Sequence, residues 1–404
     1  MNNPDSLYTS LPLHPRLDET VELLRRLIAI PSPSREESAT ADIWEKWLRG
    51  YCGEAVGRLH NNVFVVAPGF DPSRPTLMLN SHHDTVRPTA SYTRDPYSAD
   101  IVVDPTQPGI GGDRLYGLGS NDAGASGVSL AATFLDLAGY GSSLDSTEEQ
   151  EETTGRSLPF NLIFAITAAE EVMGEYGMRA FLPYLEERGL TPDMVLVGEP
   201  TGMQPAVAER GLLVFDCVTR GKSGHAARNE GINAIYRAIE DIERLRAFSP
   251  ETVSDVLGSI KVSVTMINAG TQHNILPDNC NFVADVRTTD AYTNEETVRL
   301  LQNTVKWTVM TPRSTRVHAS VISKDHPLVK SAVALGRTPF VSPTTSDMAL
   351  MHNIPSLKMG PGESSRSHSA DEYVLLSEIN EALHLYPRLI SNIDTTTFFD
   401  SPIN

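Results

Sequence analysis

Cysteine is scarce in this chain, and long apolar runs are missing from it. The 404 residues contain three cysteines, Cys52, Cys217 and Cys280, and none lies in a Cys-x-x-Cys pair. This excludes a disulfide-built scaffold and a zinc ribbon, and it favours a reducing compartment. No run approaches the roughly 20 apolar residues of a membrane helix, and residues 1–13 lack the cationic start and apolar stretch of a signal peptide. We therefore expect a cytoplasmic protein without a membrane partner.

Positive charge is also in short supply. Lysine and arginine number 33 against 51 aspartates and glutamates, which gives a net charge of −18. Because phosphate binding needs clustered cations, nucleic acid is excluded as a partner. A hydrophobic share of 40% and a charged share of 21% are ordinary for a globular enzyme. At 404 residues the chain is too long for one hydrophobic core, so two domains are expected.

Apolar periodicity predicts an α/β catalytic domain that is interrupted by a smaller domain. Buried-type strands alternate with amphipathic helices through residues 1–208 and again through 324–404. The intervening residues 209–323 read as strand, helix, strand, strand, helix, strand, with the second helix over 295–309 and the last strand over 317–322. This βαββαβ order is that of a ferredoxin-like module.

Residues 141–157 differ in composition from the rest of the catalytic domain. They are acidic, rich in serine and threonine, and almost devoid of apolar side chains. Such a segment cannot bury enough apolar surface to fold, so we expect a disordered surface insertion that is dispensable for folding.

Five short segments each leave an apolar run and deliver an acid or a histidine. They are Ser81-His82-His83-Asp84, Ser120-Asn121-Asp122, Ala169-Glu170-Glu171, Gly198-Glu199-Pro200 and Ser367-His368-Ser369. Four of them follow an expected strand, and the segment of Asp122 lies where a glycine-rich turn enters a helix. In doubly wound α/β sheets, ligands bind in the crevice at the carboxyl ends of the strands. We expect the five segments to meet there.

Each segment taken alone has an ordinary structural explanation. His82 would be a loop histidine with satisfied hydrogen bonds, Asp122 a turn or N-cap residue, and Glu199 a plain loop acid. Their joint occurrence in this order is what favours a two-metal hydrolase site. Imidazole and carboxylate ligands without thiolate suit zinc, cobalt or manganese.

These segments resemble those of the M20 family of co-catalytic zinc hydrolases, and the resemblance spans essentially the whole chain. Five motifs match: His82-x-Asp84, the glycine-rich turn 117–122, Glu170-Glu171, Gly198-Glu199-Pro200, and His368 after Gly360-Pro361-Gly362. Segments 221–228 and 270–274 are similar to the acetylornithine deacetylase-like branch, which is related to succinyl-diaminopimelate desuccinylase, aminoacylase and glutamate carboxypeptidase. The resemblance implies a dizinc exopeptidase-type catalytic domain interrupted by an inserted lid and dimerisation domain.

The resemblance also implies a set of metal ligands. Asp122 would bridge two divalent ions in each subunit, with zinc expected and cobalt or manganese as alternatives. His82 and Glu199 would complete the ligands of one ion. Glu171 and His368 would complete those of the other.

Two further residues of these segments would act in catalysis. Glu170 would be the general base, and Asp84 would hydrogen-bond the outer ring nitrogen of His82 and set its tautomer. On the residues alone His83 competes with His82 as the ligand, although the ligand-x-acid spacing favours His82. Arg87 is either a loop cation or a contact for an acyl carboxylate.

Three residues of the inserted domain match substrate-binding positions of the family. His225 and Asn274 would stabilise the developing oxyanion, with His225 contributed by the partner subunit of a homodimer. Arg287 would hold the carboxylate of a small-molecule substrate. The implied reaction is deacylation of an N-acyl amino acid in arginine biosynthesis, such as N-acetylornithine, N-acetylcitrulline or N-succinylornithine. The alternatives are a di- or tripeptidase or carboxypeptidase, and a non-catalytic binding protein that retained the fold.

Overall fold

The structure is a computed structural model that describes residues 11–107, 110–141, 158–228 and 230–395. The described chain divides into two compact units. Their bounds are Met1–Val207, Ile322–Phe340 and Ile354–Asn404 for unit 1, and Ala208–Val321 and Val341–Asn353 for unit 2. Val341–Asn353 therefore groups with unit 2, whereas the sequence pattern assigned it to the catalytic domain. Residues 142–157 of the expected insertion lie outside the described residues, so its disorder stays a prediction.

Most strands of a large mixed sheet belong to unit 1, whereas Ser320–Val321 at its end belong to unit 2. Its order is β1 (Val56–Leu59), β2 (Asn62–Val66), β6 (Asn161–Thr167), β3 (Thr76–His82), β7 (Met194–Val197), β15 (Ser356–Lys358), β8 (Ala206–Glu209) and β13 (Ser320–Val321), with β14 (Phe340–Ser342) beside β8. The neighbours β6, β3, β7 and β15 run parallel, so their carboxyl ends lie at one edge. Every residue of β3, β6 and β7 is buried, as in a sheet covered on both faces.

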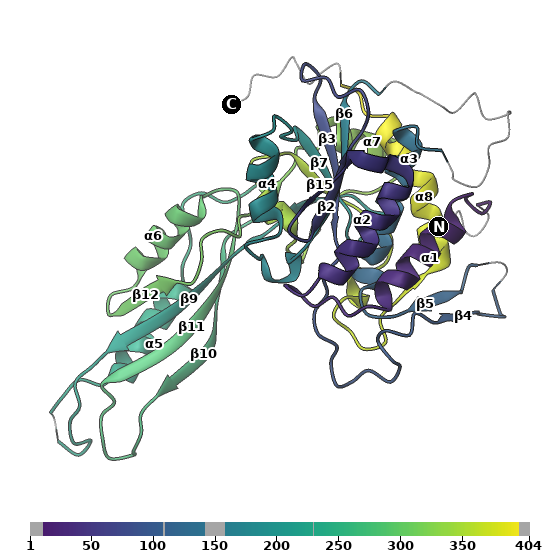
Figure 1. The fold of residues 1–404 in the computed structure, drawn as a ribbon. Coiled ribbons are helices and arrows are strands. Elements are labelled where there is room, and N and C mark those ends of the chain that lie inside the picture. Colours follow the sequence, from purple (N-terminus) through teal and green to yellow (C-terminus); the bar gives the residue numbers. More distant parts are fainter. Residues whose placement is uncertain (1–10, 108–109, 142–157, 229, 396–404) are drawn as a thin grey trace. The chain divides into compact units, whose positions relative to one another are not determined.

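Helices cover both faces of this sheet (Figure 1). One face packs into the main core with α1 (Leu17–Ile28), α2 (Ser38–Cys52), α3 (Ala125–Leu137), α7 (Pro327–Ala334) and α8 (Leu376–Ser391). There the rings of Trp44 and Phe164 lie 5.9 Å apart between centroids. The other face is covered by α4 (Met178–Glu186), where Phe181 lies 5.3 Å from Phe64. None of the helices in the described part of the chain has the length and apolar character needed to cross a membrane.

A small second sheet in unit 1 joins two parts of the chain that are far apart in sequence. Its order is β16 (Tyr373–Leu375), β5 (Arg114–Tyr116) and β4 (Ile101–Val102). In the antiparallel register, Tyr373 faces Tyr116. The pairing brings the segment after His368 beside the glycine-rich turn that leads to Asp122.

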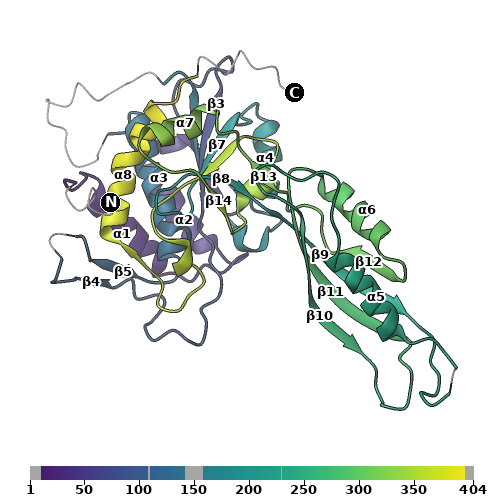
Figure 2. The same ribbon diagram turned by 180° about the vertical axis from the view of Figure 1, so that it is seen from behind.

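Unit 2 is a four-stranded antiparallel sheet covered on one face by two helices (Figure 2). The strand order is β10 (Lys261–Ala269), β11 (Asn279–Thr288), β9 (Gly211–Arg220) and β12 (Thr308–Pro312), and the helices are α5 (Ala234–Arg246) and α6 (Asn294–Thr304). Along the chain these elements follow the order β9, α5, β10, β11, α6, β12. The inner sheet face buries alternate residues of β9 and β11 against the helices, as half-covered antiparallel strands do.

Two details expected for this region are wrong. The helix expected over 295–309 ends at Thr304, because the buried carboxylate of Asp241 accepts the next main-chain N–H groups, of Lys306 (2.8 Å) and Trp307 (2.7 Å). The fourth strand of the sheet is β12, in which Thr308 and Met310 are buried in alternation with exposed neighbours. The segment 317–322 contributes instead the short strand β13, which pairs with β8.

Candidate active site

The candidate residues of unit 1 meet at the carboxyl ends of its parallel strands. His82 is the last residue of β3, Glu170-Glu171 follows β6 in a short 3-10 helix, and Glu199 follows β7. Asp122 lies in the turn that leads into α3, and His368 follows the glycine-containing loop after β15. Five segments separated by up to 286 residues (368 minus 82) thus converge on one sheet edge.

Two groups of three donor residues could each hold a metal ion. The first is His82, Asp122 and Glu199, and the second is Asp122, Glu171 and His368; within each group the donor atoms lie within 4.8 Å of one another. His82 Nε2 lies 3.2 Å from Asp122 Oδ1 and 3.5 Å from Glu199 Oε1. His368 Nε2 lies 3.0 Å from Glu171 and 3.6 Å from Asp122 Oδ2. The two oxygens of Asp122 therefore face different histidines.

The density of carboxylates shifts the pKa values of the cluster. Burial disfavours the charged form of His82, but its hydrogen bonds to Asp122 and Asp84 outweigh this and raise its pKa well above the usual value. The hydrogen bond to Glu171 raises the pKa of His368 to about 9. Burial, with the charge of Asp122, raises the pKa of Glu199 to about 8. Protons thus partly balance the negative charge that a bound cation would balance instead.

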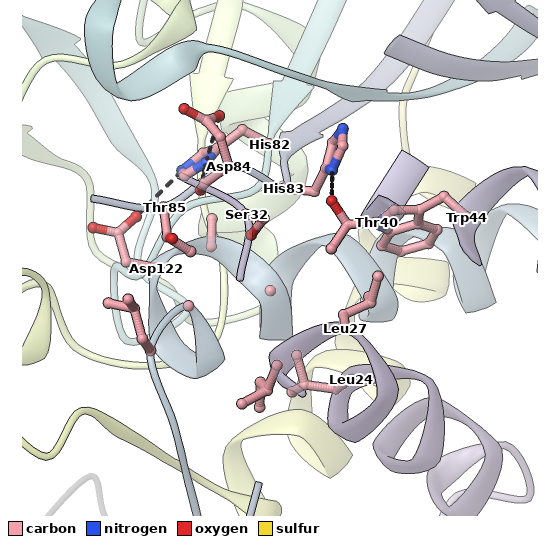
Figure 3. Close-up of a pocket in the computed structure, with 15 residues that line it drawn as sticks. Leu24, Leu27, Ser32, Thr40, Trp44, His82, His83, Asp84, Thr85 and Asp122 are labelled. Atoms are coloured by element: carbon pink, nitrogen blue, oxygen red, sulfur yellow. Dashed lines mark hydrogen bonds and ion pairs between the residues drawn. The ribbon is translucent and has the colours of Figure 1, made fainter. Parts of the chain in front are cut away.

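Asp84 contacts two parts of the cluster, of which Figure 3 shows the contact with His82. His82 Nδ1 lies 3.0 Å from the main-chain oxygen of Asp84 and 3.5 Å from its Oδ1. Since both are acceptors, Nδ1 carries a proton and Nε2 is left to face the donor cluster. The buried Asp84 carboxylate also accepts from Ser34 Oγ (2.7 Å) and from the main-chain N–H groups of Glu170 (3.0 Å) and Glu171 (3.2 Å). The carbonyl, rather than the expected carboxylate, is the nearer partner of the ring.

Glu170 lies beside His82 and belongs to neither donor group. Its side chain is buried, and Oε2 lies 4.0 Å from His82 Nε2. The residue before it, Ala169, has a positive φ of 56° and donates its main-chain N–H to Glu37 Oε1 at 3.1 Å. Hydrogen bonds to Glu37 and Asp84 therefore fix the backbone on which Glu170 stands.

His83 points away from the cluster that His82 faces (Figure 3). Its Nδ1 lies 2.8 Å from Thr40 Oγ1, and its Nε2 lies 2.9 Å from the main-chain oxygen of Asn61. Burial lowers the pKa of His83 to about 4, so the ring is neutral at pH 7. Both ring nitrogens are occupied within the protein, which leaves His82 as the histidine that reaches the donors.

Arg87 lies at the surface. Its side chain is 72% exposed and pairs with Glu36 at 2.5 Å. This contact agrees with a loop cation.

The three substrate-binding candidates lie in unit 2. His225 and Asn274 are exposed and lie on neighbouring segments. The main-chain N–H of Ala226 donates a hydrogen bond of 3.0 Å to the main-chain oxygen of Asn274. Arg287 pairs with Asp285 on its own strand, with Nε 2.8 Å from Oδ1. Arg287 lies near the end of β11, where it is opposite Leu212 of β9. The segments of His225 and Asn274 lie next to the start of β11. Within unit 2, the structure does not bring Arg287 together with the other two.

Three residues that hold the site were missed in the sequence. They are Ser34, Glu37 and Glu372. Burial and the charge of Asp122 raise the pKa of Glu372 to about 8. Only the position of Glu372 could have indicated its role in the sequence. It comes four residues after His368 and directly before a strand with alternating burial.

Comparison with known proteins assigns the chain to a family. The family described as Peptidase family M20/M25/M40 matches residues 78–392. The chain belongs to this family. The resemblance inferred from the motifs is thereby confirmed, and the protein is an M20 metal-dependent amidohydrolase with a mixed α/β fold.

Relatives in the M20 family cover nearly the whole chain. Succinyl-diaminopimelate desuccinylase of Dinoroseobacter shibae is 26% identical over 93% of this chain and 99% of its own length. Acetylornithine deacetylase of Shigella sonnei is 26% identical over 89% of this chain and 94% of its own length. A solved structure of a dinuclear metal-binding M20 peptidase from Bacillus subtilis has a TM-score of 0.65 at 17% identity, covering 93% of this chain and 97% of that one. The similarity to that structure concerns the fold.

Proposed function

We propose that this protein hydrolyses the amide bond of an N-acyl amino acid at a pair of divalent metal ions. The observation that carries the proposal is the position of Asp122, whose Oδ1 faces His82 and whose Oδ2 faces His368. Ions of a two-metal site lie roughly 3.5–4 Å apart, a span that one carboxylate can bridge. His82 and Glu199 would complete the first site, and Glu171 and His368 the second.

The donor atoms fit zinc, with cobalt and manganese as alternatives. They are imidazole nitrogens and carboxylate oxygens, without a thiolate among them. With Nδ1 held as a donor, Nε2 is the nitrogen that would bind a metal, in place of the proton that it carries in the metal-free protein. When bound, the two ions would polarise the substrate carbonyl and lower the pKa of a water between them from about 15.7 toward 7.

Glu170 serves as the general base in this proposal. Its carboxylate is buried 4.0 Å from His82 Nε2 of the first donor group, and it belongs to neither group. It takes a proton from the attacking water and passes it to the departing amine. Asp84 supports this step because it accepts the main-chain N–H of Glu170 and also fixes the tautomer of His82.

We assign substrate recognition to unit 2. His225 and Asn274 donate hydrogen bonds to the oxyanion that forms on the attacked carbonyl, a contribution of about 10²–10³ in kcat for each donor removed in comparable enzymes. Arg287 binds the substrate carboxylate, in exchange for its present partner Asp285. The two relatives named above act on a succinyl and an acetyl amide, and we propose an N-acetyl or N-succinyl derivative of ornithine, or N-acetylcitrulline, in arginine biosynthesis.

Peptide hydrolysis is the second candidate, because a structural neighbour is a peptidase. A binding protein without catalysis is disfavoured by the complete set of donors and by Glu170. Purified protein should therefore be tested on N-acetylornithine, N-acetylcitrulline, N-succinylornithine, N-succinyl-diaminopimelate, a dipeptide and a tripeptide. We expect one of the acyl amino acids to give the highest kcat/KM. A higher value for a peptide would assign the peptidase activity, and no hydrolysis of any compound would refute catalysis.

The same assay tests the metal requirement. Treatment with dipicolinate should abolish hydrolysis, and added zinc should restore it, because the bound ions would activate the attacking water. The untreated enzyme diluted in the same buffer is the control. A rate that chelation leaves unchanged would overturn the two-metal proposal.

We also propose a cytoplasmic homodimer joined through unit 2. Strand β10 lies at the edge of the four-stranded sheet and exposes Met266 (66%) and Ile267 (55%). On the adjacent α5, Tyr236 (68%) and Ile239 (44%) are exposed as well, since the buried face of this helix is made by Ala234, Ala238, Asp241 and Leu245. An open edge strand with apolar side chains is a template for pairing with a second chain. The three cysteines are free and buried, which agrees with a reducing cytoplasm.

A further inference from the structure

Glu372 is a buried acid that is not a metal donor, yet it contacts the segment that carries Asp122. Its side chain is 1% exposed. The Oε1 atom accepts the main-chain N–H groups of Asn121 at 2.8 Å and of Asp122 at 3.0 Å. The main-chain oxygen of Glu372 accepts from Gly117 at 2.9 Å. One residue therefore holds the glycine-rich turn at both of its ends.

The loop that carries His368 is tied to the same turn through Asn121. Asn121 Oδ1 accepts the N–H of Glu363 at 3.0 Å, and Asn121 Nδ2 donates to the Glu363 oxygen at 3.1 Å. Glu372 and Glu363 flank His368 in sequence, so both sides of its loop are fastened to the turn before Asp122. The distance between His368 and Asp122 is thus set by main-chain contacts and not by the two side chains alone.

A buried carboxylate at this place is costly unless it serves the site. Burying a polar group is unfavourable unless its hydrogen bonds are satisfied, and the Glu372 carboxyl satisfies its own on the main chain of Asn121 and Asp122. A neutral side chain with one acceptor oxygen could make the same two hydrogen bonds at Oε1. This makes the position of the oxygen separable from the charge of the group.

We propose that Glu372 is a positioning residue that fixes the Asp122 carboxylate relative to His368, so that one carboxylate can serve both metal ions. This inference rests on the proposed function. Glu372 acts through the main chain of Asn121 and Asp122, and it touches neither substrate nor metal. If the oxygen is moved from this place, the metal affinity of the donor group that contains Asp122 and His368 falls.

Two substitutions separate position from charge. Glu372→Gln keeps the side-chain length and one acceptor oxygen but removes the charge. Glu372→Asp keeps the carboxyl group but withdraws its oxygens by one methylene, out of reach of the two N–H groups. Asp371→Asn is the matched control, because Asp371 belongs to neither donor group and its Oδ1 also accepts two successive N–H groups, those of Thr93 and Arg94 at 2.9 Å each.

The measurement is manganese binding to the full-length protein, followed by atomic emission for stoichiometry and by electron paramagnetic resonance. The wild type and Asp371→Asn should bind two ions with an exchange-coupled spectrum. Glu372→Gln should do the same with less than about a tenfold loss of affinity for the second ion. Glu372→Asp should lose about 10–100-fold, the range for residues that orient metal ligands, and its spectrum should become that of isolated ions.

The outcomes distinguish this inference from the proposed function. A wild-type protein that never binds two coupled ions would refute the two-metal proposal and the inference with it. If the wild type binds two and Glu372→Asp binds them equally well, only the inference fails. The inference also fails if Glu372→Gln loses more affinity for the second ion than Glu372→Asp, since the charge would then matter and the position of the oxygen would not. It fails as well if Asp371→Asn loses as much affinity as Glu372→Asp.

Discussion

His82 and His83 are adjacent in the chain, but their rings lie in opposite environments. His82 Nε2 faces carboxylates, whereas both nitrogens of His83 are bound to Thr40 and Asn61. The strand places successive side chains on opposite faces, and this alternation separates the two rings. Residues of the same type therefore have different expected effects when they are replaced.

His82→Ala should lose one of the two ions and nearly all activity, because it removes a donor of the first group. His83→Gln should keep both ions but lower the free energy of unfolding by about 1–3 kcal/mol, since Thr40 and Asn61 lose a buried partner. Atomic emission gives the metal content and urea denaturation gives the stability. A His83→Gln protein with a single ion would contradict the assignment of His82 as the ligand.

Glu170→Gln should retain both ions and lose about 10²–10⁴ in kcat, the usual contribution of a positioned general base. KM should change little, because the carboxylate handles a proton and does not hold the substrate. Glu171→Gln is the neighbouring control, and it should lose an ion because Glu171 belongs to a donor group. Wild-type turnover in Glu170→Gln would assign proton transfer to another residue.

The convergence of the candidate donors on one sheet edge could be predicted from the sequence, but the residues that support them could not. His82, Glu171 and Glu199 come within a few residues of apolar runs typical of buried strands, so their place at the sheet edge follows from the pattern. Glu37 and Glu372 act by accepting main-chain N–H groups of residues 132 and 250 positions away, respectively. Every residue except proline has a main-chain N–H, so the sequence does not indicate which one an acid binds. Only the folded structure shows the partner.

Asp241 connects two elements of unit 2, the helix α5 and the strand β12. It is completely buried, and its carboxylate accepts from the N–H groups of Lys306 and Trp307, from Thr308 Oγ1 and from Arg244. Burial alone would raise the pKa of Asp241, but these hydrogen bonds outweigh it and lower the pKa below 3.8. The stabilisation is therefore complete above pH 3.8 and is lost as the pH falls through the lower folded-state value.

Asp241→Asn should destabilise unit 2 by about 1.5–3 kcal/mol at pH 7, since hydrogen bonds to a charged acceptor are lost. The difference from the wild type should shrink as the pH falls below 3.8. Hydrogen exchange read by mass spectrometry reports the two units separately, and the change should be confined to unit 2. Glu240→Gln, which alters the neighbouring acid on the exposed face of α5, should change stability by less than about 0.5 kcal/mol. Equal effects of the two substitutions would show that the buried contacts contribute little.

The elements themselves differ in how well the sequence predicts them. Strands β3, β6 and β7 are buried on both faces, and each contains a continuous run of apolar residues, which is why they could be predicted. The end of α6 is decided by Asp241, which lies 65 residues before Lys306. Helical periodicity alone therefore predicted a helix that continued to residue 309, and β12 was not predicted.

At the scale of the whole molecule, the assembly depends on the open edge of unit 2. Met266→Lys together with Ile267→Lys places two charges on β10 and should convert a dimer into monomers, because edge pairing tolerates such charges poorly. Light scattering coupled to size exclusion should give twice the chain mass for the wild type and the single mass for the variant. Val333→Lys on α7, also exposed, is the control and should remain dimeric. A monomeric wild type would refute the proposed dimer.

The central claim is that Asp122 lies between two metal ions. Its most direct test is an anomalous difference map from crystals of the zinc-loaded protein, recorded above and below the zinc absorption edge. Two peaks are expected in each chain, one bounded by His82 and Glu199 and the other by Glu171 and His368, with Asp122 between them. A single peak, or peaks that do not touch Asp122, would contradict the claim.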